Sequence, residues 1–108
     1  MRPGLHSAGL ALLLALSSTA AVGAPPMPRQ QELMHLLKHD CGSCHGLTMR
    51  GGLGSALVPD RLQHMTVEGL AAVILDGVPG TPMPPWRPLL SEAEATWMAE
   101  QLKNGVPQ

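Results

Sequence analysis

The chain has 108 residues and a formal net charge of −1, with 12 Gly, 11 Pro, two Trp and no Phe or Tyr. This charge balance, without any cluster of Lys or Arg, argues against nucleic acid as a partner. A chain of this length forms one small domain, and so few aromatic side chains give it little apolar bulk for a core of its own. We therefore expect a bound group to fill the interior.

Residues 1–24 are typical of a secretory signal peptide. Arg2 supplies the positive charge, residues 8–16 are the apolar run, and residues 22–24 are the small residues that precede the cleavage site. The alternative, a transmembrane anchor, would need about 20 apolar residues. We expect the mature domain to be residues 25–108, located in the periplasm, with no membrane span and a net charge of −2 once Arg2 is removed.

The first helix is predicted over residues 29–40, where leucines recur three and four positions apart. Gly42 and the glycines after it are expected to interrupt regular structure. The segment from Gly46 to Pro59 is predicted to be a loop with at most one short turn.

The second helix is predicted to start near Thr66, a good N-cap residue, and to end at Gly77. Residues 78–88 follow, with five prolines in eleven positions. Proline cannot continue a helix or a central strand, so this segment is expected to be a stiff, extended loop.

The last helix is predicted to begin at Ser91, because Ser91 and Glu94 match the S-x-x-E capping box. Gly105 is a suitable residue to follow its C-terminus. No alternating strand pattern occurs in the chain. The sequence therefore predicts an all-α domain of three to four helices joined by Gly/Pro-rich loops.

Cys41, Cys44 and His45 form a C-x-x-C-H motif, and the chain has no other cysteine. A thioredoxin-like pair would need a βαβ context, a zinc site would need four ligands, and a disulfide over this spacing would be strained. C-x-x-C-H is instead typical of c-type haem attachment. On one helical turn both thiols point to the same side, and the histidine next to them can reach the iron. We expect one covalently attached haem c.

Met83 is the predicted second axial ligand of the iron. It lies between Pro82 and Pro84, which hold the backbone in place and remove competing amide donors. Met65 is the alternative thioether. Ligation by a second histidine would draw on His35, His39 or His64.

The ring nitrogen of His45 that does not face the iron needs an acceptor, which a backbone carbonyl of residues 51–57 can provide. The glycines of this loop allow a close approach to the haem. The haem propionates need donors. The candidates are Arg50, Arg61, Arg87 and the indole of Trp86 or Trp97, although Trp97 is expected to pack the last helix against the first.

The segments CGSCHG and PMPPW, the Gly-rich loop and the capped last helix together resemble class I monohaem cytochromes c. The resemblance implies an all-α fold in which the first and last helices cross and one haem edge is exposed. It also implies that Cys41 and Cys44 bind the haem, with His45 as the proximal ligand and Met83 as the distal ligand.

CGSCHGLTMRGGLGSAL and ILDGVPGTPMPPW are similar to the NirC-type periplasmic cytochromes associated with cytochrome cd-type nitrite reductase. This resemblance implies electron delivery to that reductase, or a part in the maturation of its haem d. Ser55 replaces the proline that is usual in the glycine-rich loop of the family. Its carbonyl can still accept a hydrogen bond from His45.

The function predicted from these features is that of a periplasmic one-electron carrier, and not of an enzyme. An iron with both His45 and Met83 bound has no position for a substrate, and the rest of the sequence shows no catalytic constellation. The alternatives are an open-site haem protein that binds a small ligand, an accessory role in haem d maturation, and a relay within a permanent complex. The expected partners are nitrite reductase and a periplasmic or membrane-bound electron donor, and we expect a monomer.

Overall fold

The computed structural model describes residues 3–4 and 23–108, which contain helices and no strand, as the sequence predicts. The helices are α1 (Met27–Leu36), the π-helix η1 (Leu37–Cys41), α2 (Gly42–His45), α3 (Pro59–Leu62), α4 (Val67–Asp76) and α5 (Glu92–Asn104). The predicted apolar run of the signal peptide lies outside the described residues. No helix in the described part of the chain is long and apolar enough to cross a membrane.

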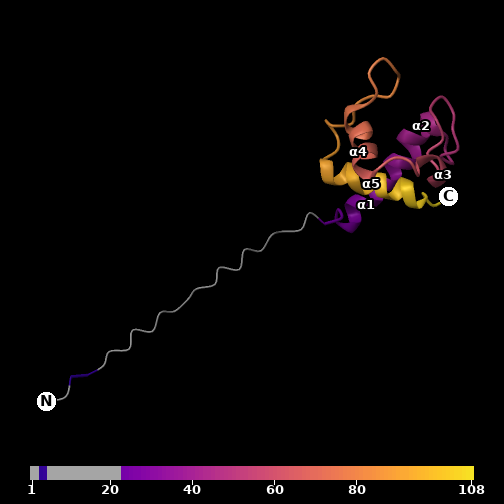
Figure 1. Cartoon of the computed structure of the whole chain (residues 1–108). Coiled ribbons are helices and arrows are strands. Elements are labelled where there is room, and N and C mark those ends of the chain that lie inside the picture. The colour runs from indigo at the N-terminus through magenta and orange to yellow at the C-terminus, as the bar shows by residue number, and fades with distance from the viewer. Residues whose placement is uncertain (1–2, 5–22) are drawn as a thin grey trace.

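The helix α5 is the centre of the arrangement. It contacts α4 most extensively and also contacts α1 and α3 (Figure 1). The loop between α4 and α5 extends away from the helices on one side. The N- and C-terminal helices are therefore in contact, as expected for this class of fold.

The first helical segment is longer than the sequence predicts. It starts at Met27 and continues without a break through η1 and α2 to His45. The prediction that Gly42 interrupts it is wrong, because Gly42 has helical angles (φ −62°, ψ −25°) and is buried. A Cβ at this position would lie 3.4 to 3.5 Å from atoms of Leu47 and Met49, which is ordinary van der Waals contact.

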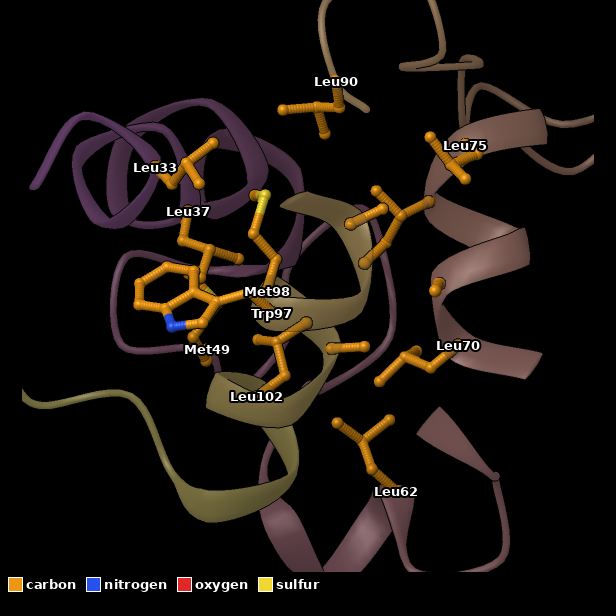
Figure 2. Close-up of a cluster of buried hydrophobic side chains, with 14 residues drawn as sticks. Leu33, Leu37, Met49, Leu62, Leu70, Leu75, Leu90, Trp97, Met98 and Leu102 are labelled. Atoms are coloured by element: carbon orange, nitrogen blue, oxygen red, sulfur yellow. The ribbon is translucent and has the colours of Figure 1, made fainter. Parts of the chain in front are cut away.

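Fourteen apolar residues form a buried core, which corrects the expectation that the chain has no core of its own (Figure 2). Leu33 and Leu37 of the first segment are fully buried together with Met98 of α5. Trp97 is 8% exposed and packs in this cluster, in agreement with its predicted place between the first and last helices. The longer first helical segment and α5 thus bury more apolar side chains than the composition suggests.

The loop after α4 folds back onto the end of that helix. Gly77 ends α4 as predicted, with φ +66°. The amides of Trp86 and Arg87 donate to the carbonyls of Ile74 and Leu75 at 3.1 and 3.0 Å, which satisfies the free carbonyls of the last turn. A Cβ on Gly77 would lie 2.7 Å from the carbonyl oxygen of Met83, so glycine is required both for its dihedral angles and for this close approach.

The short helix α3 has no counterpart in the sequence prediction. Its end is held by Lys103 of α5, whose ammonium donates to the carbonyl of Leu62 at 2.9 Å and also to the carbonyl of Met65. This contact joins residues about forty positions apart. Local sequence patterns cannot indicate it.

The predicted capping box is present at the start of α5. Ser91 Oγ accepts from the Glu94 amide at 3.1 Å, and Glu94 Oε2 accepts from the Ser91 amide at 2.9 Å. Arg29 of α1 donates to Glu94 Oε1 at 2.6 Å. The guanidinium and the Ser91 amide both stabilise the carboxylate and hold the pKa of Glu94 below its usual range. One side chain therefore caps α5 and ties it to α1.

We predict that Glu94→Gln lowers the midpoint of thermal unfolding of the haem-loaded protein at pH 7. Glutamine can still form the capping box, so the variant removes mainly the charge. A carboxyl group with a lowered folded-state pKa stabilises the protein above its unfolded pKa, and this contribution is lost as the pH falls through the folded pKa. The difference between variant and wild type should therefore disappear in acid. Melting curves from pH 7 down to pH 3 measure this.

Glu100→Gln is the matched control, because Glu100 is an exposed carboxylate on the same helix. It should leave the midpoint close to that of the wild type. A difference for Glu94→Gln that stays constant down to pH 3 would contradict the assigned role of the charge.

Candidate cofactor site

A cavity of about 620 Å³ lies between the helices and two loops. Its lining comes from five parts of the chain: positions within residues 37–45, 53–57, 62–74 and 78–86, together with Leu102. Most of these side chains are apolar. Several of the buried core leucines line the cavity on one side, so the wall of the cavity is the continuation of the core.

The C-x-x-C-H motif is at the mouth and wall of this cavity. Cys41 ends η1, while Cys44 and His45 lie in α2, and all three line the cavity. The Cys41 thiol is partly buried beside the Asp40 carboxylate. Burial, and to a smaller extent this negative charge, raises its pKa to about 11. Cys44 is exposed. The helical turn predicted for the motif is thus present.

The imidazole of His45 is fixed from one side. Its Nδ1 lies 2.7 Å from the carbonyl oxygen of Ser55. A carbonyl can only accept, so Nδ1 carries a proton, and in the neutral imidazole the lone pair is then on Nε2. This confirms the expectation that a carbonyl of residues 51–57 accepts from His45. It also shows that serine in place of the family's proline leaves the bond intact.

Gly54 lies directly against the His45 ring. A Cβ at Gly54 would be 2.7 Å from both Cε1 and Nδ1 of the imidazole, a distance that forces the ring or the loop to move. The loop is bonded back to the helix end, since Gly54 donates to the Cys44 carbonyl and Gly51 donates to the His45 carbonyl, each at 2.8 Å. The close approach that the structure shows is between the loop and the histidine, whereas the sequence predicts one between the loop and the haem.

Two of the six methionines in residues 25–108 line the cavity, namely Met65 and Met83. The amide of Met83 donates to Thr81 Oγ1 at 3.3 Å, and that hydroxyl donates to the Val78 carbonyl at 2.7 Å. The Thr81 hydroxyl thus helps the three prolines around Met83 to hold the turn. Thr81 was not among the residues predicted for the site, although threonine hydroxyls are known to stabilise turns.

The alternative histidine ligands do not reach the cavity, since His35, His39 and His64 are exposed and absent from its lining. Met49 and Met98, which were not predicted as ligands, are buried in the core. The structure therefore brings Met83 and Met65 to the same cavity as His45 and leaves those three histidines outside it.

Most of the residues predicted to donate to the haem propionates do not line the cavity. Arg87 is 2.7 Å from Asp76 and 3.4 Å from Glu92, and these carboxylates raise its pKa. Among the described residues no Lys or Arg lines the cavity, whereas Trp86 does and Trp97 does not. Asp40, which the sequence analysis did not single out, is the carboxylate at the lining. Of the five proposed donors, only Trp86 is in place.

These residues fit a c-type haem. The cavity combines an apolar interior with two thiols on one helical segment, an imidazole with a free Nε2 and thioether side chains. Thiols can form thioether bonds, while neutral imidazole and thioether sulfur are common axial ligands of haem iron. The described residues contain no group of three or more His, Cys, Asp or Glu that could hold a metal ion.

Comparisons with known proteins agree with this site. The family described as cytochrome c oxidase, cbb3-type, subunit III matches residues 28–101. A cytochrome c55X of Paracoccus denitrificans is 56% identical over 96 residues, which cover 88% of this chain and 93% of that protein. A dihydro-heme d1 dehydrogenase of Pseudomonas aeruginosa is 32% identical over 93% of this chain, which corresponds to 19% of that protein.

A solved structure of a c-type cytochrome NirC is also similar. It has 51% sequence identity and a TM-score of 0.72, and the match covers 74% of this chain and 94% of that one. The family match, the curated relative and this structure all cover the segment that carries the cavity and the C-x-x-C-H motif. The chain belongs to the c-type cytochromes and, within them, to the cytochrome c55X family.

Proposed function

We propose that this chain is a periplasmic one-electron carrier that holds one haem c and delivers electrons to nitrite reductase. The observation that carries the proposal is that Cys41, Cys44, His45 and Met83 line the same apolar cavity. They come from an N-terminal helical segment and from a loop nearly forty residues further on. Bound haem would supply a one-electron Fe(II)/Fe(III) couple.

Each group has a distinct role in this proposal. Cys41 and Cys44 hold the cofactor through thioether bonds. His45 presents Nε2 as the proximal ligand, because the Ser55 carbonyl occupies Nδ1. Met83 is the distal ligand, and Thr81 and the close packing on Gly77 limit the movement of its backbone. The thioether favours the reduced iron and raises the potential.

An electron carrier also suits the cavity mouth. With both axial positions filled by the protein, electrons must pass through the edge of the ring. Leu53 is 79% exposed and Val78 is 40% exposed, and both line the cavity, as does the exposed Cys44. A redox partner can therefore approach the edge over an apolar rim. Electron transfer, and not substrate turnover, is the function of the cytochromes c to which the chain belongs.

The proposed partner is based on similarity to a known cytochrome, and the proposed compartment is based on the sequence. The similarity to a NirC cytochrome supports nitrite reductase as the electron acceptor. Residues 1–24 support export to the periplasm by their signal-peptide pattern. We propose residues 25–108 as the mature domain, acting as a monomer and receiving electrons from a periplasmic or membrane-bound donor.

A second candidate function is an accessory role in haem d maturation. It is favoured by one observation, the match to a short part of a dihydro-heme d1 dehydrogenase. A domain similar to this chain thus forms part of an enzyme whose name refers to that cofactor. In this alternative the chain would exchange electrons with such an enzyme instead of with nitrite reductase.

Mixing the reduced, haem-loaded chain with a cytochrome cd-type nitrite reductase tests the main proposal. We expect the chain to be reoxidised only when nitrite is added, with the rate following the reductase concentration. The Cys41→Ala/Cys44→Ala double variant should lack stable covalent haem and serve as the inactive control. Failure of this reoxidation, together with reduction of the oxidised chain by a dihydro-heme d1 dehydrogenase and its substrate, would favour the second function.

Met83→Leu should keep the covalent haem and lower its reduction potential by on the order of 0.1 V or more, because the axial ligand is a main determinant of the potential. The weak far-red absorption band of a ferric iron–sulfur bond should disappear. Leucine has nearly the same volume, so packing changes little. Potentiometry and absorption spectra measure both effects.

Met65→Leu is the matched control, since Met65 also lines the cavity. It should retain the band and the potential. The reverse pattern would assign the distal position to Met65, and an unchanged spectrum in both variants would reject a methionine ligand.

Gly54→Ala should destabilise the haem-loaded protein by about 1–3 kcal/mol, the usual effect of overpacking. The added methyl group would overlap the His45 ring and weaken its bond to Ser55. Denaturant unfolding followed by haem absorption measures the loss. Gly42→Ala is the control, because its new Cβ would make only ordinary contacts at 3.4 to 3.5 Å. Equal stability of the two variants would contradict the proposed packing on the proximal histidine.

A further inference from the structure

Two histidines outside the haem site lie next to each other on the surface. His35 is in the last turn of α1 and His39 is in η1, and both side chains are exposed. Their ring centroids are 4.3 Å apart, with 43° between the ring planes. Neither ring lines the cavity, so the proposed electron-transfer function uses neither of them.

The position of the two residues on the helix explains why their rings are close. His35 is in α1 and His39 is in η1, which continues α1 without a break. Residues four positions apart on a helix are neighbours on one face. The two imidazole rings therefore lie on the same face of this segment, about one turn apart.

We propose that His35 and His39 form a surface site for a divalent transition-metal ion, with Cu(II) bound most tightly. Neutral imidazole nitrogens suit Cu, Ni and Zn, and affinities among these ions peak at Cu(II). Two histidines four residues apart on one helix face are a known metal-binding arrangement. The site is separate from the cavity and does not depend on the identity of the haem ligands.

The site has two protein ligands in the described part of the chain. No group of three or more His, Cys, Asp or Glu suited to a metal ion occurs there. Glu32 is one turn before His35, but its carboxylate is bonded to Arg29 at 2.8 Å. Water therefore fills the other coordination positions, and the ion exchanges readily with the surrounding solution. The site responds to the free copper concentration and does not hold a permanent ion.

Calorimetric titration of the mature, oxidised, haem-loaded protein with Cu(II) tests the proposal, together with electron paramagnetic resonance of the copper. We expect one ion per chain and a copper signal split by imidazole nitrogens. Either His35→Gln or His39→Gln should weaken binding by about 100-fold, because losing one of two linked ligands removes the chelate. The low-spin haem spectrum of each variant should match that of the wild type, which shows that the fold is intact.

His64→Gln is the matched control, since His64 is a single exposed histidine away from the cavity lining. It should leave the affinity unchanged. In titrations with Zn(II), the variants should rank in the same order of affinity, and each should bind Zn(II) more weakly than Cu(II). The proposal is overturned if the His35→Gln/His39→Gln double variant binds Cu(II) as the wild type does, or if His64→Gln weakens binding as much as the single variants do.

Discussion

The wall of the cavity that carries His45 depends on one hydrogen bond, from His45 Nδ1 to the carbonyl oxygen of Ser55. It fixes the tautomer and directs the free lone pair away from the loop. The bond requires the loop to pass within contact distance of the ring, which only a residue without a side chain at position 54 permits. The loop is in turn fastened to the carbonyls of Cys44 and His45 at the end of α2. Helix end, loop and histidine therefore form one unit.

The opposite wall of the cavity is also held by a close-packed glycine and by backbone hydrogen bonds to a helix end, with different residues. Gly77 ends α4 and lets the backbone around Met83 come close to it. The amides of Trp86 and Arg87 then return to the last carbonyls of α4. In both walls a glycine allows a loop to pack closely, and amides that follow donate to carbonyls at the end of a helix. The two candidate axial ligands, His45 and Met83, are thus positioned mainly by backbone contacts and not by flexible side chains.

Between these walls, the core and the cavity share their residues. Leu37 and Leu102 are fully or almost fully buried and also line the cavity. A chain without Phe or Tyr can bury a small helical core, but on one side that core ends in an apolar surface. An apolar cofactor would cover this surface and add to the stability, since burying apolar area contributes about 25 cal/mol per Å². Binding of the cofactor and folding are therefore expected to be coupled.

The sequence by itself determined the features that depend on near neighbours: the C-x-x-C-H turn, the Thr66 and Ser91 caps, and the proline-rich loop. Each follows from the chemistry of residues within a few positions. Only the tertiary structure decided which methionines reach the cavity, that Gly42 stays helical, that Lys103 holds the end of α3, and that the three arginines predicted as donors lie elsewhere. These features join residues far apart in the chain, and their position depends on how the helices pack, which no local pattern records.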